Sequence, residues 1–318
     1  MKDLNELSLR QKVGQLIFFG FHGTQVNDHA VSAIRDDHMG NVILFTRNFQ
    51  SARQLYDLVK ELHALAMRHN GVPLLISVDQ EGGSITRFTS DLTWFPGSMA
   101  IAALDDPALA ERVGEGIGRE LRAMGINMNL GPSVDICNNE DNPNIGSRSY
   151  SNDPAVIASY AGGYVRGLQR HAIATIKHFP SIGSSNVDLH LSLGENHAPL
   201  EALKALEMRA VSLTLSEKPH AVMISHEIYH GVEDMPATVS RRMIFGQLRQ
   251  ALGYEGLIIS DCMEMKALDH CCGTARGCVR AVQAGTDLLL VCHTQSVQRA
   301  SAEALRKAVE SGEISLER

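Results

Sequence analysis

Four side chains suited to proton transfer and ion pairing flank one short polar loop. The segment KHFPSIGSSNVDLH begins with Lys177 and His178 and ends with Asp188 and His190. A histidine is the usual proton-transfer group near neutral pH, and a carboxylate beside it can fix its tautomer and raise its pKa. The D-x-H pair therefore indicates acid–base chemistry. The alternative is an Asp that makes a local turn hydrogen bond beside a surface His.

Asp261 is a second candidate because it directly follows the apolar run GLIIS. A carboxylate at the end of a buried strand is costly unless it is paired or functional. The position predicts a nucleophile or base, or else the N-cap of a helix that begins MEMKAL. Cys262 and Met263 leave little else polar nearby to need an acid, which favours the functional alternative.

Further charged residues could hold a polar ligand. In SVDQEGGSITRF, Asp79 precedes a Gly-Gly turn and Arg87, a spacing that could hydrogen-bond sugar hydroxyls or a carboxylate. Arg148 lies in a polar loop, where a solvated charge is the default. Lys177 needs a partner if it is buried, which would be a ligand oxygen, Asp135 or Asp261.

Eight short apolar runs alternate with amphipathic, helix-like segments and would position these residues. Parallel strands that are buried on both faces read as such continuous apolar runs. Eight of them in a chain of 318 residues predict a (β/α)₈ TIM barrel, and the lack of G-x-G-x-x-G after the first run disfavours a doubly wound open sheet. The runs are 16–21, 41–45, 73–79, 127–136, 172–179, 220–226, 255–261 and 286–293.

Polar side chains gather at the carboxyl ends of these runs, where TIM-barrel active sites form. They are Asp79, Asp135, Lys177, His178, His226, Glu227, Asp261 and His293. A metal-dependent amidohydrolase could use His178, His190, His226 and His293 with Asp261. Such barrels begin with H-x-H after the first strand, where this chain has the single His22, so we expect no metal site.

Composition restricts the classes of function. The formal net charge of −7 disfavours nucleic-acid binding, because no basic surplus is present to displace counterions. We find no apolar run of membrane-spanning length and no secretory signal in MKDLNELSLRQKVGQ, and therefore expect a cytoplasmic protein without a membrane partner. The spacing of the six cysteines matches no zinc ligand set, and we expect reduced thiols.

Several motifs together resemble one enzyme family. The pattern KHFP…G-x₄-D-x-H (177–190), with VGQLIFFGF, SVDQEGG…TRF, LGPSVDI, GSRSYSNDP, LGYEGLIISD and AGTDLLLV, resembles family-three glycoside hydrolases of the β-N-acetylglucosaminidase subgroup. The resemblance covers nearly the whole chain. The D-x-H loop distinguishes this subgroup from the family-three β-glucosidases, which lack that pair.

The resemblance implies an exo-acting, retaining β-N-acetylhexosaminidase that hydrolyses terminal β-linked GlcNAc in chito-oligosaccharides or peptidoglycan fragments, without a cofactor. Asp261 matches the nucleophile, His190 the general acid/base and Asp188 its orienting partner. Five other residues match positions that hold the terminal sugar, namely Asp79, Arg87, Arg148, Lys177 and His178. The alternatives are a phosphorylase, because a His acid/base does not repel phosphate, and a non-catalytic sugar-binding barrel.

The chain departs from the family pattern in the loop that usually reads KHFPGHGD. Ser181, Ile182 and Ser184 replace Gly, His and Asp, and Ser181 lacks the easy access of glycine to positive φ, so we expect a changed loop path. We predict one TIM-barrel catalytic domain over residues 1–318. Relatives continue through a further helix or a C-terminal domain, which leaves a single-domain enzyme and a truncated chain as the two alternatives.

Overall fold

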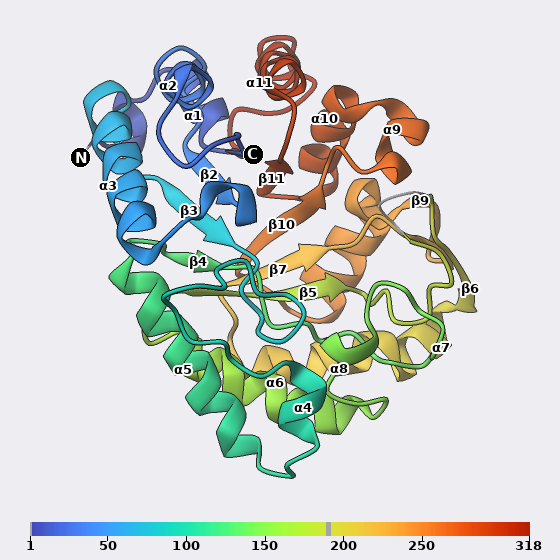
Figure 1. The fold of residues 1–318 in the computed structure, drawn as a ribbon. Helices are drawn as coiled ribbons and strands as arrows, with labels where there is room; N and C mark the ends of the chain where they lie inside the picture. The colour runs from blue at the N-terminus through green and yellow to red at the C-terminus, as the bar shows by residue number, and fades with distance from the viewer. Residues whose placement is uncertain (1, 189–191) are drawn as a thin grey trace.

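The first and last of eight parallel strands pair with each other and close a barrel (Figure 1). In the computed structural model, which describes residues 2–188 and 192–318, Ile17 lies opposite Leu289 and Phe19 opposite Val291. Around the barrel the order is β1-β11-β10-β7-β5-β4-β3-β2. The strands are β1 (Ile17–Phe19), β2 (Asn41–Leu44), β3 (Leu75–Val78), β4 (Met128–Asn129), β5 (Ile173–Phe179), β7 (Ala221–Ile224), β10 (Leu257–Cys262) and β11 (Leu288–Val291). Each coincides with a predicted apolar run, so the predicted (β/α)₈ TIM barrel is confirmed.

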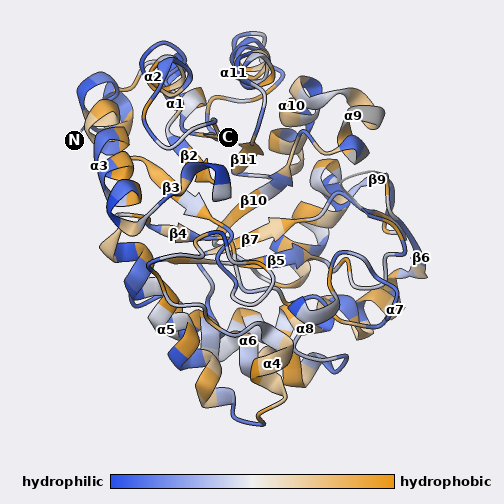
Figure 2. Ribbon diagram, in the orientation of Figure 1, coloured by the Kyte–Doolittle hydropathy of each residue, from blue (hydrophilic) through white to orange (hydrophobic). Residues whose placement is uncertain are grey.

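Helices surround the barrel with their apolar faces inward, as the hydropathy colouring shows (Figure 2). In α5 the Asp106 side chain accepts a hydrogen bond from Ala108 N at 3.0 Å, Pro107 occupies the first turn, and Gly125 follows the helix with φ +81°. These are the expected start and stop signals. The helices are α1 (Leu9–Gly14), α2 (Asp28–Arg35), α3 (Ala52–His69), α4 (Ser98–Ala102), α5 (Pro107–Ala123), α6 (Pro154–Leu168), α7 (Leu200–Ala205), α8 (Glu207–Thr214), a π-helix (Arg242–Ala251), α9 (Lys266–Cys272), α10 (Thr274–Ala284) and α11 (Gln295–Glu310).

Successive strand residues face opposite sides of the barrel wall. Phe18 points into the barrel and packs with Ile43 and Met223, whereas Ile17 and Phe19 belong to the apolar layer beneath the helices. Because the interior is filled by side chains, the barrel is a rigid support rather than a pore. Polar residues at the carboxyl ends of the strands are therefore held in fixed positions.

A small second sheet, which we did not predict, stands beside the barrel near α7 (Figure 1). It consists of β6 (Glu195–Pro199), β8 (Ile228–Gly231) and β9 (Glu233–Pro236), with β8 and β9 antiparallel. It belongs to the segments that follow β5 and β7, on the same side of the barrel as the polar strand ends. Among the described residues, no helix has the length and apolar character that a bilayer crossing requires.

Candidate active site

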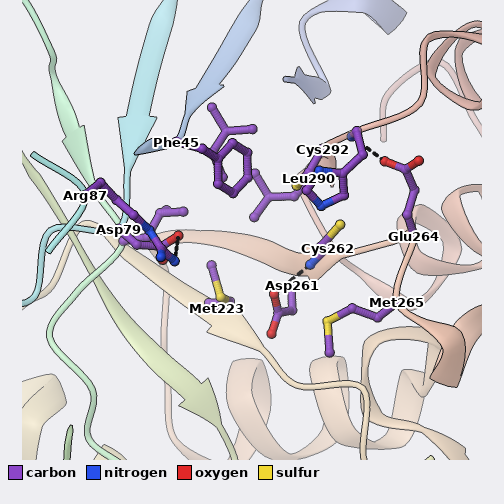
Figure 3. A pocket seen from close by; sticks show the side chains of 13 residues that line it. Phe45, Asp79, Arg87, Met223, Asp261, Cys262, Glu264, Met265, Leu290 and Cys292 are labelled. Atoms are coloured by element: carbon purple, nitrogen blue, oxygen red, sulfur yellow. Dashed lines mark hydrogen bonds and ion pairs between the residues drawn. The ribbon is translucent and has the colours of Figure 1, made fainter. Parts of the chain in front are cut away.

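Asp261 lines a pocket of about 280 Å³ at the carboxyl end of β10 (Figure 3). Asp79, directly after β3, and Arg87 line the same pocket and lie opposite Asp261 in this view. The predicted convergence of charged side chains at one end of the barrel is therefore present for these three residues.

The Asp261 carboxylate is held in its ionised form. Burial raises the pKa of this carboxyl, but His178, His226, the Cys262 backbone N–H and Lys177 together lower it more, and the pKa falls below its ordinary value. The backbone N–H of Cys262 also donates to Asp261 Oδ1 at 2.7 Å. The next helix, α9, begins only at Lys266, so Asp261 is not its N-cap and that alternative is wrong.

Lys177, on β5, is buried between two carboxylates from the segment that follows β3. In the barrel, β4 lies between β5 and β3. The Lys177 Nζ lies 2.7 Å from Asp79 Oδ1 and 2.7 Å from Glu81 Oε1. Burial raises the pKa of Asp79, but Lys177 and Arg87 together lower it more, so that Asp79 stays ionised. We expected Asp135 or Asp261 as the protein partner of Lys177, and this expectation is wrong. Both carboxylates that Lys177 contacts come from the segment that follows β3.

Arg148 binds Glu81 in a bidentate pair and is not a solvated loop charge. Its Nη2 donates to Glu81 Oε1 at 2.8 Å, its Nε donates to Glu81 Oε2 at 3.1 Å, and its Nη1 donates to Asn144 O at 2.7 Å. Burial raises the pKa of Glu81, but Arg148 and Lys177 lower it to about 2. Sequence reasoning missed Glu81. The clue in the sequence was a second acid two residues after Asp79. The chain also contains Arg148 and Lys177, which need acidic partners if they are buried.

Asp135 organises the start of the 177–190 loop. It lies 2.8 Å from His178 Nδ1 through Oδ2, accepts the Ser133 hydroxyl at 2.8 Å, and accepts the Ile182 backbone N–H at 2.8 Å through Oδ1. Burial raises the pKa of Asp135, but His178 and the Ile182 N–H lower it to about 2. The carboxylate thus fixes the His178 ring near Asp261 and ties the loop to the segment that follows β4.

The replacements at the start of this loop are built into its packing. In the part of the chain that the structure describes, positive φ at non-glycine residues occurs only at His38, Asp91, Asp105 and Lys218, so Ser181 adopts its conformation without that strain. Ser181 Oγ accepts the backbone N–H groups of Ile136 and Gly183, each at 3.3 Å. Ile182 packs against Ile145 and Met265.

Asp188 and His190 lie at the far end of the loop. The Asp188 carbonyl accepts the Ser192 N–H at 3.0 Å. His190 lies outside the described residues, so the orienting of His190 by Asp188 stays a prediction.

The histidine set of the amidohydrolase alternative is not supported. His226 is buried and both ring nitrogens are engaged, Nδ1 with Thr238 Oγ1 at 2.6 Å and Nε2 with Cys262 O at 2.9 Å. Burial also lowers the pKa of His226. Within the described ranges 2–188 and 192–318, the groups able to hold a metal are instead Cys262 with Cys292 and His293, and Glu195 with His197 and His230.

A closed parallel barrel with an ionised carboxylate in its mouth, beside buried cations paired with acids, is typical of a (β/α)₈-barrel enzyme. The chain belongs to glycosyl hydrolase family 3: residues 8–318 match the family's N-terminal domain. This confirms the resemblance seen in the sequence and the expectation of a glycoside hydrolase.

Curated and solved relatives agree with this assignment. The chain is 34% identical to a beta-hexosaminidase of Xylella fastidiosa (strain 9a5c), over 92% of this chain and 88% of the relative. It is 36% identical to a beta-hexosaminidase of Stenotrophomonas maltophilia (strain K279a), over 90% of this chain and 85% of the relative. A family 3 beta-N-acetylglucosaminidase from Paenibacillus sp. str. FPU-7 superposes with a TM-score of 0.96 at 44% identity. That match covers 98% of this chain but only 60% of the longer Paenibacillus chain. The beta-N-acetylhexosaminidase of Beutenbergia cavernae DSM 12333 superposes with a TM-score of 0.90 at 28% identity, over 96% of this chain and 93% of that one.

Proposed function

We propose that this chain is an exo-acting, retaining β-N-acetylhexosaminidase that removes terminal β-linked GlcNAc from chito-oligosaccharides or peptidoglycan fragments. The main support is the ionised Asp261 in a pocket that also contains Asp79 and Arg87. The substrate class follows from the names of the relatives. A cytoplasmic role in peptidoglycan recycling belongs to this proposal.

The reaction would proceed in two steps. First, an Asp261 oxygen attacks the anomeric carbon, the bond to the leaving oxygen breaks, and the His190 imidazolium protonates that oxygen. Then water attacks the same carbon, the neutral His190 takes its proton, and the bond to Asp261 breaks. Each step inverts the configuration at the anomeric carbon. Two inversions return it to β in the product.

The remaining residues would bind the terminal sugar. Asp79 and Arg87 line the pocket, and in this proposal they hydrogen-bond the hydroxyl groups of the sugar. Three further side chains contact acids: Lys177 contacts Asp79 and Glu81, Arg148 contacts Glu81, and His178 contacts Asp135. In this proposal these three side chains also contact the sugar or fix the side chains that do. Burial in low dielectric makes each such hydrogen bond stronger than it would be in water.

Turnover of p-nitrophenyl β-GlcNAc by wild type and Asp261→Ala tests the proposal. We expect turnover by wild type, β-GlcNAc as the first-formed anomer by NMR, and a loss of at least about 1,000-fold in the variant. Equal rates in both proteins would remove Asp261 from the nucleophile role. No turnover by folded wild type would favour a non-catalytic sugar-binding barrel, and GlcNAc 1-phosphate formed in phosphate buffer would favour the phosphorylase.

A further inference from the structure

Two cysteines and a histidine meet on the pocket wall next to Asp261. Cys262 follows Asp261 at the end of β10, Cys292 follows β11, and His293 comes next in the chain. One ligand atom from each, two sulfurs and a ring nitrogen, lie within 4.8 Å of one another. All three residues line the pocket that contains Asp261.

We propose that Cys262, Cys292 and His293 form a binding site for a thiophilic divalent cation such as Zn²⁺, and that its occupation inhibits the enzyme. The spacing of the cysteines, thirty residues apart, matches no zinc pattern in the sequence. The site arises because β10 and β11 are neighbours in the barrel.

The geometry is close to what a tetrahedral metal requires. Zinc–sulfur bonds of about 2.3 Å at tetrahedral angles place two sulfurs about 3.8 Å apart. The ligand atoms therefore need to approach by roughly 1 Å or less. Two thiols and an imidazole are a borderline-soft set that suits Zn²⁺, Co²⁺ and Cd²⁺ rather than Mg²⁺ or Ca²⁺.

The surroundings leave the site accessible and place charges of both signs beside it. Cys292 is buried, Cys262 is partly buried, and His293 is exposed at the rim. Glu264 anchors the His293 segment, since its carboxylate accepts the backbone N–H groups of His293 and Thr294 at 2.6 and 3.0 Å. The nearby Arg47 guanidinium donates to the Phe21 and Cys292 carbonyls at 2.9 Å each. Two carboxylates, Asp261 and Glu264, and the Arg47 guanidinium thus flank the site.

Binding follows a simple stoichiometry. Each metal ion displaces one proton from each of the two thiols and binds the neutral imidazole. The two displaced protons go to solvent. Three protein ligands leave the fourth tetrahedral position open to pocket water. A metal at Cys262 would stand beside the nucleophile and occupy space that the sugar needs, which is the reason to expect inhibition.

Cobalt spectroscopy tests the site without relying on catalysis. With reduced protein, Co²⁺ alone should produce a sulfur-to-cobalt charge-transfer band in the near ultraviolet, and Zn²⁺ should displace it. Cys262→Ser should lose the band and weaken zinc binding by more than the roughly 100-fold that an outer-shell partner is worth. His293→Gln, at the exposed rim, should weaken binding while the barrel folds normally.

Controls separate this site from other thiols and from the second cluster. Cys271→Ser, an exposed cysteine of α9, should keep the full band, as should His197→Gln in the exposed Glu195–His197–His230 group. The proposal is overturned if reduced wild type gives no thiolate band, or if the band survives in Cys262→Ser. Zn²⁺ should also inhibit p-nitrophenyl β-GlcNAc turnover in wild type and spare Cys262→Ser. Only this last measurement depends on the proposed function.

Discussion

Glu81 and Arg148 face each other as a buried bidentate ion pair, with two guanidinium nitrogens 2.8 and 3.1 Å from the two carboxylate oxygens. The same Glu81 carboxylate also lies 2.7 Å from Lys177 Nζ. One acid therefore compensates two buried cations, from the loop after β4 and from β5. Losing that acid leaves Arg148 without its carboxylate partner and leaves Lys177 with Asp79 alone.

Glu81→Gln should be strongly destabilising. Removal of one member of a buried ion pair typically costs about 3 kcal/mol, because the remaining charge stays buried and uncompensated. The free energy of unfolding in urea measures the loss. Asp57→Asn, which breaks the exposed i,i+4 pair with Arg53, is the matched control and should change little. Equal effects of the two substitutions would mean that the buried pair has no special role.

Acid should destabilise the protein partly through Asp135. Its pKa is lowered from 3.8 to about 2 in the folded state. A lowered folded pKa adds stability above the unfolded pKa, and this stability is lost as the pH falls from about 4 towards 2. Urea unfolding at several pH values should show a steeper loss in wild type than in Asp135→Asn. Parallel curves for the two proteins would contradict this.

Glu227 should make the protein less stable as the pH rises, whereas Asp135 makes it less stable as the pH falls. The Glu227 side chain is fully buried, and burial raises its pKa from 4.5 to about 7, although the Tyr229 hydroxyl donates to its Oε2 at 2.9 Å. A raised folded pKa gives stability that is complete below the unfolded pKa and is lost as the pH rises through the folded pKa. Between about pH 4.5 and 7, wild type should lose stability relative to Glu227→Gln, by on the order of 3 kcal/mol. A difference between the two proteins that does not vary with pH would exclude this titration.

Ile182→Ala should loosen the loop that leads to His190. Ile182 is buried against Ile145 and Met265, and truncation of a buried isoleucine costs about 2 kcal/mol or more. We expect a lower melting temperature and a lower kcat, because the loop loses an apolar anchor. Leu104→Ala, at an exposed leucine, is the control and should change neither value. An unchanged kcat with lowered stability would show that the anchor serves folding only.

His190→Ala should depend on the leaving group. Proton donation matters most when the leaving oxygen is basic, so alkyl or sugar β-GlcNAc glycosides should lose far more rate than p-nitrophenyl β-GlcNAc. Asp261→Ala should impair both classes alike, since both need the nucleophile. If His190→Ala slows both substrates equally, His190 is not the acid.

The eight barrel strands were predictable because strands buried on both faces read as mostly apolar runs, as in LLLV of β11. The small sheet was not, because β6 reads ENHAP, and its exposed polar residues carry no apolar signal. β4 is also shorter than its apolar run: only Met128–Asn129 pair in the ladder, although the run extends to residue 136.

The site could be predicted only in part. Positions at strand ends identified Asp79, Lys177 and Asp261, since those positions follow from the local pattern. Pairings did not follow, because the partner of Lys177 is determined by which strands become neighbours in space. The meeting of Cys262 with Cys292 was hidden for the same reason, since thirty residues of chain separate them.

Barrel closure makes β1, the first strand of the barrel, depend on β11, the last barrel strand to be synthesised. β1 pairs on one side with β2 and on the other with β11, which ends at Val291. Until β11 has left the ribosome, β1 and β10 are open edges that can pair with other chains. Translation that stops before residue 288 should therefore give an aggregating fragment instead of a smaller barrel, because β1 and β10 would each keep an unpaired edge.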